Sequence, residues 1–221
     1  MTEMVTITGL YQGRIRPMEG DGRPTGIYKK PVREAVAVDD AGLEDDHQGD
    51  PKAHGGPDRA LSHYPAEHYA ALSELFPEAT SLLGPGILGE NVSTNGLTER
   101  TVHVGDVFRI GTALVEVSQP RQPCWKVSHR LGLPDLARCI ADSGRSGWLY
   151  RVLDPGYVSP GDVIERVEVA GHGYTLARLW AIRNETRPDR EHLEFLAELE
   201  TLAESWRQRF SQRLDWLRRH A

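Results

Sequence analysis

The stretch TVHVGDVFRIGTALVEVSQPRQPCWK, residues 101–126, is the most informative segment of the sequence. Apolar residues recur at or near every second position in 101–110 and again in 113–119, a period typical of half-buried β-strands. The second run leads directly into a proline-rich, cationic segment that contains Cys124. We therefore expect two strands, with Cys124 in the loop that leaves the second, where functional residues are frequent.

Similar alternation occurs elsewhere in the first three-quarters of the chain. It appears in VTITGLYQG (5–13), REAVAVD (33–39) and DVIERVEV (162–169), separated by turn signals rich in glycine and proline. Many short strands with such spacers favour a β-barrel or sandwich over a doubly wound sheet. Segments with helical spacing at 65–76 and 133–144 interrupt the strands. The predicted fold class is mainly β with some α, that is, α+β.

The period of the apolar residues changes after residue 170. Apolar side chains then follow helical steps of three and four in three successive segments, the last of which is a long stripe from Leu202 to Leu217. Three short helices of this kind can pack together as a small unit. We predict two domains: a β-barrel over residues 1–170 and a three-helix domain over 171–221.

Composition narrows the functional classes. Of the 221 residues, 39% are hydrophobic and 26% are charged, as in ordinary globular proteins. The net charge of −6 argues against broad affinity for nucleic acids, whose phosphates need a cationic surface. No apolar run approaches the roughly 18–20 residues of a membrane span, and the first residues lack the features of a signal peptide. We expect a cytoplasmic protein that binds neither nucleic acid nor membrane.

The charge is nevertheless uneven. Residues 203–221 carry five arginines against two carboxylates, a local excess of +3. The excess is consistent with a solvated helix face, or with a docking surface for an acidic partner protein.

The chain has two cysteines, and a reducing compartment keeps both as thiols. Cys139 lies on the apolar face of the helix predicted at 133–144, where we expect a small buried hydrophobic residue. Cys124 lies between Arg121 and Lys126, and nearby cations favour the thiolate, which is the reactive and metal-ligating form. The flanking prolines restrict the backbone and fix the direction of the sulfur. Cys124 is therefore the candidate functional thiol.

The segment 45–69 is rich in histidine, with residues 47, 54, 63 and 68 near several aspartates. Histidine and carboxylate are zinc ligands, but the segment has neither HExxH nor CxxC spacing. The sequence HGG (54–56) suggests a different site, because its two glycines can expose backbone N–H groups to an anion. Arg59 follows closely and can pair with a phosphate.

Two further segments suggest contacts with a ligand. The amide of Asn91, in GENVSTNGLTE (89–99), can read a ligand's donor and acceptor edge, although the same sequence can simply begin a turn. In GRSGWLYRV (144–152), Trp148 and Tyr150 offer stacking surfaces for a flat ligand or else belong to the core.

Together these motifs resemble the MOSC family, named for the C-terminal domain of molybdenum-cofactor sulfurase, and more narrowly its YiiM-like subfamily. The resemblance rests on GLEDDHQ (42–48), HGGPDRALSHYP (54–65), GENVSTNGLTE (89–99), VSQPRQPCWK (117–126) and GWLYRV (147–152), in the family's order and spacing. The tail resembles the three-helix unit that follows the barrel in this subfamily. The similarity covers nearly the whole chain.

The resemblance implies a barrel that binds the molybdenum cofactor (molybdopterin), with the thiolate of Cys124 ligating molybdenum. A soft thiolate suits this metal. The positions that match the family's cofactor-binding motifs, with Lys30 as the alternative to Lys29, are Lys29, His54, Gly55, Gly56, Arg59, Asn91, Ser118, Arg121 and Cys124. Asp46 matches the acid of the first motif, and Asp46 and His54 are candidates to assist proton transfer. The subfamily usually has glycine before that acid, whereas this chain has Asp45.

The implied activity is reduction of the N–O bond of small N-hydroxylated compounds of the hydroxylaminopurine, hydroxylamine or amidoxime type, a detoxification reaction. Electrons would come from a separate redox protein, a flavoprotein or an iron–sulfur protein, because the chain has no flavin fingerprint and too few cysteines for a cluster. The alternatives are a carrier of the cofactor or of a persulfide without turnover of its own, and a zinc hydrolase built on the histidines. The oligomeric state stays open.

Overall fold

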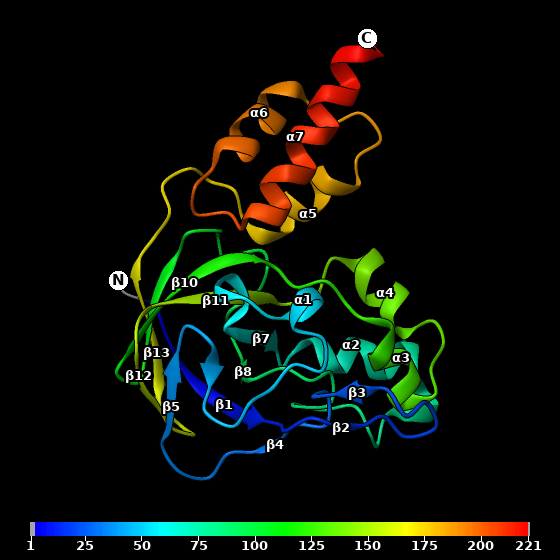
Figure 1. Ribbon diagram of the computed structural model, residues 1–221, viewed down its shortest axis with the longest axis vertical. Coiled ribbons are helices and arrows are strands. Elements are labelled where there is room, and N and C mark those ends of the chain that lie inside the picture. Colours follow the sequence, from blue (N-terminus) through cyan, green and yellow to red (C-terminus); the bar gives the residue numbers. More distant parts are fainter. Residues whose placement is uncertain (1–2, 221) are drawn as a thin grey trace.

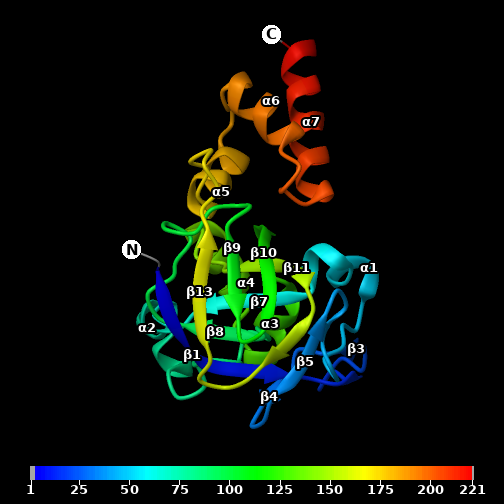
Figure 2. The ribbon, with the colours of Figure 1, turned by 90° about the vertical axis from the view of Figure 1, so that its left-hand side faces the viewer.

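The computed structural model describes residues 3–220, and its central element is a closed ring of seven strands (Figures 1 and 2). In ring order they are β1 (Met4–Gln12), β13 (Val163–Glu168), β9 (Val107–Ile110), β10 (Ala113–Pro120), β11 (Trp148–Asp154), β7 (Leu61–Pro65) and β8 (Val92–Thr94). β1 closes the ring by pairing with β13 through its first half and with β8 through its second. The predicted α+β class with a β-barrel is confirmed.

Only one neighbouring pair in the ring, β7 with β8, is parallel. An odd number of strands cannot alternate in direction all the way round, so at least one parallel pair is geometrically required. The connection between β7 and β8 is accordingly long and contains the helix α2 (His68–Leu75) and the short 3₁₀ turn η2 (Pro77–Ala79).

Short strands extend the barrel at its sides. β4 (Lys30–Pro31) pairs with the end of β1, and β2 (Arg16–Pro17) pairs with β3 (Pro24–Thr25). A small separate sheet contains β12, β5 and β6, which span Gly156–Val158, Val36–Asp39 and Gly42–Leu43.

Four helical segments besides α2 and η2 lie beside the barrel: α1 (Pro51–His54), η1 (Pro57–Arg59), α3 (Trp125–Leu131) and α4 (Leu136–Ser143). The helices α2, α3 and α4 meet in a second apolar cluster, separate from the barrel core, that includes Leu72, Val127 and Leu136. α2 and α4 lie within the helical segments predicted at 65–76 and 133–144, whereas α1 and α3 were not predicted. Cys139 is half-buried and packs against this second cluster.

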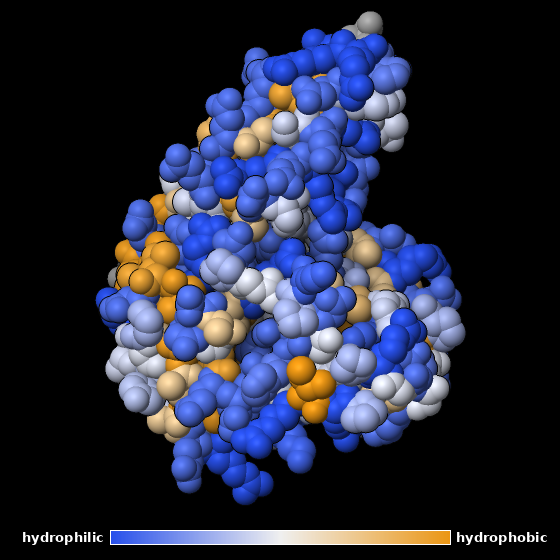
Figure 3. All heavy atoms as spheres, in the orientation of Figure 1, coloured by the Kyte–Doolittle hydropathy of each residue, from blue (hydrophilic) through white to orange (hydrophobic). Residues whose placement is uncertain are grey.

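The C-terminal unit consists of α5 (Leu176–Asn184), α6 (Arg190–Glu198) and α7 (Glu204–Arg219), stacked on one end of the barrel (Figure 1). The side chain of Thr175 caps the start of α5. Buried residues of the unit, among them Leu179 and Trp206, belong to the same apolar cluster as the barrel interior. Hydrophilic residues cover most of the unit's outer surface in Figure 3. No helix within residues 3–220 combines the length and the apolar character needed to cross a membrane.

Ser118 joins the barrel to the helical unit. The pairing of β10 with β11 shifts by one residue between Val117 and Gln119, so Ser118 forms a bulge. Its carbonyl accepts a hydrogen bond from the backbone N–H of Ala203, just before α7, at 2.9 Å. The strand that leads to Cys124 therefore also anchors the last helix.

Candidate functional site

A cavity of about 620 Å³ lies where β10 leaves the barrel. Cys124 is half-buried in its wall, directly before α3, and forms no disulfide. The cavity also brings together most of the residues singled out from the sequence, which are Lys29, Asp46, His54, Arg59, Asn91 and Arg121. Residues more than 90 positions apart in the chain thus form one wall.

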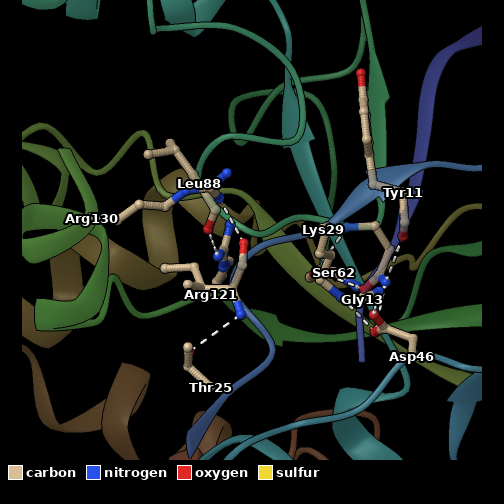
Figure 4. A network of polar contacts seen from close by, with 11 residues as sticks. Tyr11, Gly13, Thr25, Lys29, Asp46, Ser62, Leu88, Arg121 and Arg130 are labelled. Carbon is tan, nitrogen blue, oxygen red and sulfur yellow. Dashed lines mark hydrogen bonds and ion pairs between the residues drawn. The ribbon is translucent and has the colours of Figure 1, made fainter. Parts of the chain in front are cut away.

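Asp46 is the centre of a hydrogen-bonded network that we call the floor: Tyr11, Gly13, Lys29, Asp46, Ser62 and Asn91 (Figure 4). Its Oδ1 accepts a bond from the backbone N–H of Gly13 at 2.7 Å. Its Oδ2 accepts bonds from Lys29 Nζ at 2.5 Å and from Asn91 Nδ2 at 2.9 Å. Three donors on one carboxylate fix its position and satisfy it without water.

Lys29 is the basic partner of this network, whereas Lys30 is exposed in β4. Only 9% of the Lys29 side chain and 2% of the Asp46 side chain remain accessible to solvent. Burial lowers the pKa of Lys29, and the adjacent Asp46 carboxylate opposes that shift. The buried charges are tolerated because each is paired and hydrogen-bonded.

Asn91 uses its amide entirely within the protein. Its Oδ1 accepts bonds from the backbone N–H and the hydroxyl of Ser62 at 3.0 and 2.8 Å, and its Nδ2 also donates to the carbonyl of Tyr11 at 3.1 Å. With the bond to Asp46, all the hydrogen-bonding groups of this amide are occupied. In this arrangement Asn91 positions Asp46, and its predicted role in reading a ligand edge stays a prediction.

Asp45, the departure from the subfamily pattern, has a φ of 61° and is the one non-glycine residue with positive φ in residues 3–220. Glycine adopts this left-handed conformation without strain, and aspartate is among the residues that tolerate it. The turn therefore keeps the shape that glycine favours. The side chain of Asp45 pairs at the surface with Arg14 at 2.7 Å, away from the floor.

Three other cations of the cavity wall are held by backbone carbonyls. Arg121 donates to the carbonyl of Leu88, Arg59 to that of Ala53 at 2.6 Å, and Lys126 to that of Pro24 at 2.9 Å. These bonds fix the side chains without neutralising their charge. The lining contains six lysine and arginine side chains, from Lys29, Lys52, Arg59, Arg121, Lys126 and Arg209, and a single carboxylate, Asp46. In a protein of net charge −6, this lining makes the cavity locally cationic.

His54 lies at the end of α1, where the residue stays largely exposed at the cavity entrance. Partial burial of its ring, and then the nearby cations Lys126 and Arg121, lower its pKa below the usual value of 6.5. This shift favours the neutral form of the His54 imidazole.

Three predicted cofactor-binding residues lie outside the cavity lining: Gly55, Gly56 and Ser118. The N–H of Gly55 donates to the carbonyl of Pro51 at 2.9 Å, which occupies one of the two donors expected for an anion. The hydroxyl of Ser118 is fully buried and lies within hydrogen-bonding distance of the carbonyls of Asp58 and Leu149, at 2.6 and 3.0 Å. Ser118 thus links η1, β11 and the C-terminal unit.

Trp148 and Tyr150, the alternative stacking residues, are completely buried in the barrel core. The histidines of segment 45–69 are likewise separated. His63 is buried between Tyr150 and Thr94, His68 pairs with Glu99 at 2.7 Å, and His47 is exposed. Within residues 3–220 no three histidine, cysteine, aspartate or glutamate side chains are arranged to hold a metal ion.

Among the lining residues that the sequence analysis did not single out are Lys52, Gln119, Ser205 and Arg209. Gln119 is only 4% exposed, its carboxamide makes no hydrogen bond with residues 3–220, and its Oε1 is fully buried. The carboxamide of Gln119 is therefore open to a hydrogen bond from a water or a ligand in the cavity. Its place inside the motif SQPRQPC was a usable signal, whereas nothing in the sequence indicated that α7 reaches the cavity.

The fold and the site together are typical of one class of protein, which combines a barrel, a helical unit and a cationic cavity beside a single cysteine. Comparison with known families identifies this class. Residues 50–165 match the MOSC domain, and the chain belongs to the MOSC domain family. Residues 175–215 match the YiiM-like 3-alpha helix domain, which identifies the C-terminal unit.

Individual relatives support the same membership. Protein YiiM of Escherichia coli (strain K12) is 45% identical over 161 residues, which cover 72% of this chain and 71% of that protein. The crystal structure of YiiM from Geobacillus stearothermophilus superimposes with a TM-score of 0.81 at 34% identity, covering 96% of this chain and all of that one. A protein named "Reductase" from Gibberella moniliformis is 35% identical over 71% of this chain, which spans 28% of that larger protein.

Proposed function

We propose that this protein is a molybdenum-cofactor-dependent reductase of N-hydroxylated compounds, with Cys124 as the protein ligand of molybdenum. Membership of the MOSC family and the relative named as a reductase support a reductase or sulfurase-like role related to this cofactor. The observation that carries the proposal is a free thiol in the wall of a cavity that contains six cationic side chains and one carboxylate.

The residues of the cavity fit such a cofactor. A single soft thiolate suits a metal whose other ligands come from an organic cofactor, and among residues 3–220 no three histidine, cysteine, aspartate or glutamate side chains are grouped to hold a metal by themselves. Arg59, Arg121 and Lys126 are positioned to bind a phosphate, and the unpaired amide of Gln119 suits a heterocycle with hydrogen-bonding edges. When bound, the cofactor supplies the two-electron chemistry that protein side chains lack.

The chain's own residues then bind and orient the reactants and handle protons. Reduction of R–NH–OH to R–NH₂ and water consumes two electrons and two protons. The lowered pKa of His54 favours the neutral imidazole, whose free ring nitrogen can take a proton from solvent; the imidazolium formed can then donate that proton to the departing hydroxyl, which returns His54 to its neutral form. Asp46 instead keeps Lys29 in place, since both of its oxygens are occupied.

The electrons come from a separate redox protein under this proposal. The chain's two cysteines cannot provide the four thiolates of an ordinary iron–sulfur cluster. The donor is therefore a flavoprotein or an iron–sulfur protein that meets the protein near the cavity.

Replacement of Cys124 tests the proposal. Protein purified from a molybdenum-replete host is assayed with an artificial electron donor and an N-hydroxylated base, and its molybdenum and pterin contents are measured. Cys124→Ser is expected to abolish reduction and lower the molybdenum content without lowering the unfolding temperature, because the thiol makes no disulfide. The matched control Cys139→Ser keeps both activity and metal, since Cys139 lies outside the cavity lining.

Full activity of the Cys124→Ser protein would falsify the proposed role of the thiol. A parent protein that contains the cofactor but reduces no N-hydroxylated substrate with the artificial donor would indicate the alternative function, a carrier of the cofactor or of a persulfide.

A further inference from the structure

Two cations at the mouth of the cavity differ from the others. Lys52, in α1, and Arg209, in α7, are both exposed and both line the cavity. Neither makes a hydrogen bond or an ion pair with any of residues 3–220. We call this pair the rim. Figure 2 shows the start of α7 facing the end of the barrel that carries α1.

The rim is distinct from the rest of the arginine-rich helix. Arg213 binds the carbonyls of Glu185 and Thr186, and Arg218 pairs with Glu194 at 3.0 Å. Arg219 donates to the carbonyl of Asp215 at 3.2 Å. Three of the five arginines of α7 thus have acceptors within the helical unit, whereas Arg209 lines the cavity.

The rim also differs from the inner cations. Lys29, Arg59, Arg121 and Lys126 are at least half-buried and held by protein acceptors, as expected for groups that retain a resident cofactor. Exposed cations without partners suit a ligand that enters and leaves. Two of them match the charge of a phosphate monoester, which is about −1.5 to −2 at pH 7. Gln119, whose buried Oε1 has no partner among residues 3–220, adds an uncharged polar group to the same cavity lining.

We propose that Lys52 and Arg209 bind the phosphate of the substrate, so that the preferred substrate is an N-hydroxylated nucleotide rather than the free base or the nucleoside. This inference rests on the proposed reductase function and specifies its substrate class. In this arrangement the helical unit completes the substrate site of the barrel.

The test compares three substrates with one reactive group: 6-hydroxylaminopurine, its ribonucleoside and its ribonucleoside 5′-monophosphate. The nucleoside controls for size, so the ratio of kcat/KM for monophosphate over nucleoside measures the phosphate contact. We expect a ratio of about 10 at low ionic strength, falling with added salt because the rim is exposed. Arg209→Gln and Lys52→Gln should each lower the ratio about threefold. Arg219→Gln, which removes the same charge from the same helix, should leave it unchanged.

A second measurement separates this inference from the proposed function. Adenosine 5′-monophosphate, the nucleotide product, is titrated calorimetrically into the purified protein and into the Arg209→Gln variant, which requires no turnover. Weaker binding of the nucleotide to the variant supports phosphate binding by the rim, even if the parent protein reduces no substrate. Absence of reduction by itself overturns only the reductase function. A kcat/KM ratio of monophosphate to nucleoside near 1 in an active parent protein would contradict phosphate binding by the rim. Loss of pterin and molybdenum from Arg209→Gln would also contradict it, because that loss would assign the arginine to the cofactor.

Discussion

The floor and the rim of the cavity use charged residues in opposite ways. In the floor, Asp46 and Lys29 are buried, and protein partners satisfy Asp46 and Asn91 completely. In the rim, Lys52 and Arg209 are exposed and have no partner among residues 3–220. The floor resembles a folded core, in which removal of one partner disturbs all the others.

This difference indicates a division of labour within a single cavity. A preorganised floor suits a group that stays bound, because its geometry is set before any ligand arrives. A rim of exposed cations suits charged ligands that enter and leave, because exposed pairs contribute little energy each and respond to salt. Stability should therefore depend on the floor, and ligand selection on the rim.

The largest expected effect comes from breaking the floor. Asp46→Ala leaves the Lys29 ammonium buried without its partner and should lower the free energy of unfolding by about 3–5 kcal/mol. Urea unfolding monitored by circular dichroism measures the change. In the double variant Asp46→Ala/Lys29→Met, part of the loss should be recovered, since the unpaired charge is gone.

Asp45, the carboxylate that precedes Asp46 in the sequence, provides the control for Asp46→Ala. Asp45→Asn removes a charge whose partner, Arg14, is 75% exposed, and asparagine tolerates the same left-handed backbone. Its effect should stay below about 1 kcal/mol. Equal losses of unfolding free energy in Asp46→Ala and Asp45→Asn would contradict the distinction between a buried floor and a solvent-exposed charge.

The next effect is the dependence of stability on pH, which we assign to the buried His63. His63 lies next to Ser62 of the floor, and its complete burial lowers its pKa to about 3. Between pH 6.5 and about 3 the unfolded chain binds a proton at this histidine and the folded protein does not. The stability contributed by neutral His63 is thus complete above pH 6.5 and is lost as the pH falls, by about 1 kcal/mol per pH unit.

Unfolding free energies measured from pH 7 to 4 test this assignment. His63→Gln can keep hydrogen bonds to Tyr150 and Thr94 while removing the titrating group, so the slope of stability with pH should be shallower. His47→Gln, which changes an exposed histidine of the same segment, should keep the parent slope. If the His63→Gln variant also keeps the parent slope, other groups cause the loss of stability in acid.

The smallest effect concerns Gln119, an unsatisfied group of the cavity lining. Gln119→Leu replaces a buried carboxamide without partners by an apolar side chain of similar size. The ligand-free protein should gain about 1 kcal/mol, which raises the unfolding temperature by roughly 2–4 °C. Gln122→Leu, at a half-buried cavity position, should give no such gain, and a loss of stability in Gln119→Leu would show that the amide is satisfied in solution.

The sequence allowed prediction of the strands in which one face is buried and the other is not. β10 alternates between buried and half-buried residues from Ala113 to Val117, and its period was visible. The three residues of β8 are all buried, so that strand has no period to detect. The residues of β11 were interpreted as a ligand-stacking segment or as core, and their burial is a consequence of the barrel closing around them.

The candidate site could likewise be predicted from the sequence only in part. Local chemistry indicated Cys124, Arg121 and His54, and the family resemblance added Asp46 and Lys29, all of which line the cavity. Lys52 and Arg209 look like ordinary surface charges in the sequence, because only the packing of the helical unit on the barrel brings them to one opening. Ser118, a motif residue expected to bind cofactor, lies outside the cavity lining and forms hydrogen bonds that join three elements, which the sequence did not indicate.

The way the barrel closes also affects how the chain is made. β1 pairs with β13 from Met4↔Glu165 to Thr6↔Val163, so the first strand has no partner on that side until about 160 more residues have been synthesised. At the usual speed of a ribosome this interval lasts roughly 8–30 s. During that time β1 can pair with β8 but exposes its other edge, and an exposed edge readily pairs with another chain. The N-terminal strand therefore keeps an unpaired edge through most of the synthesis of the barrel.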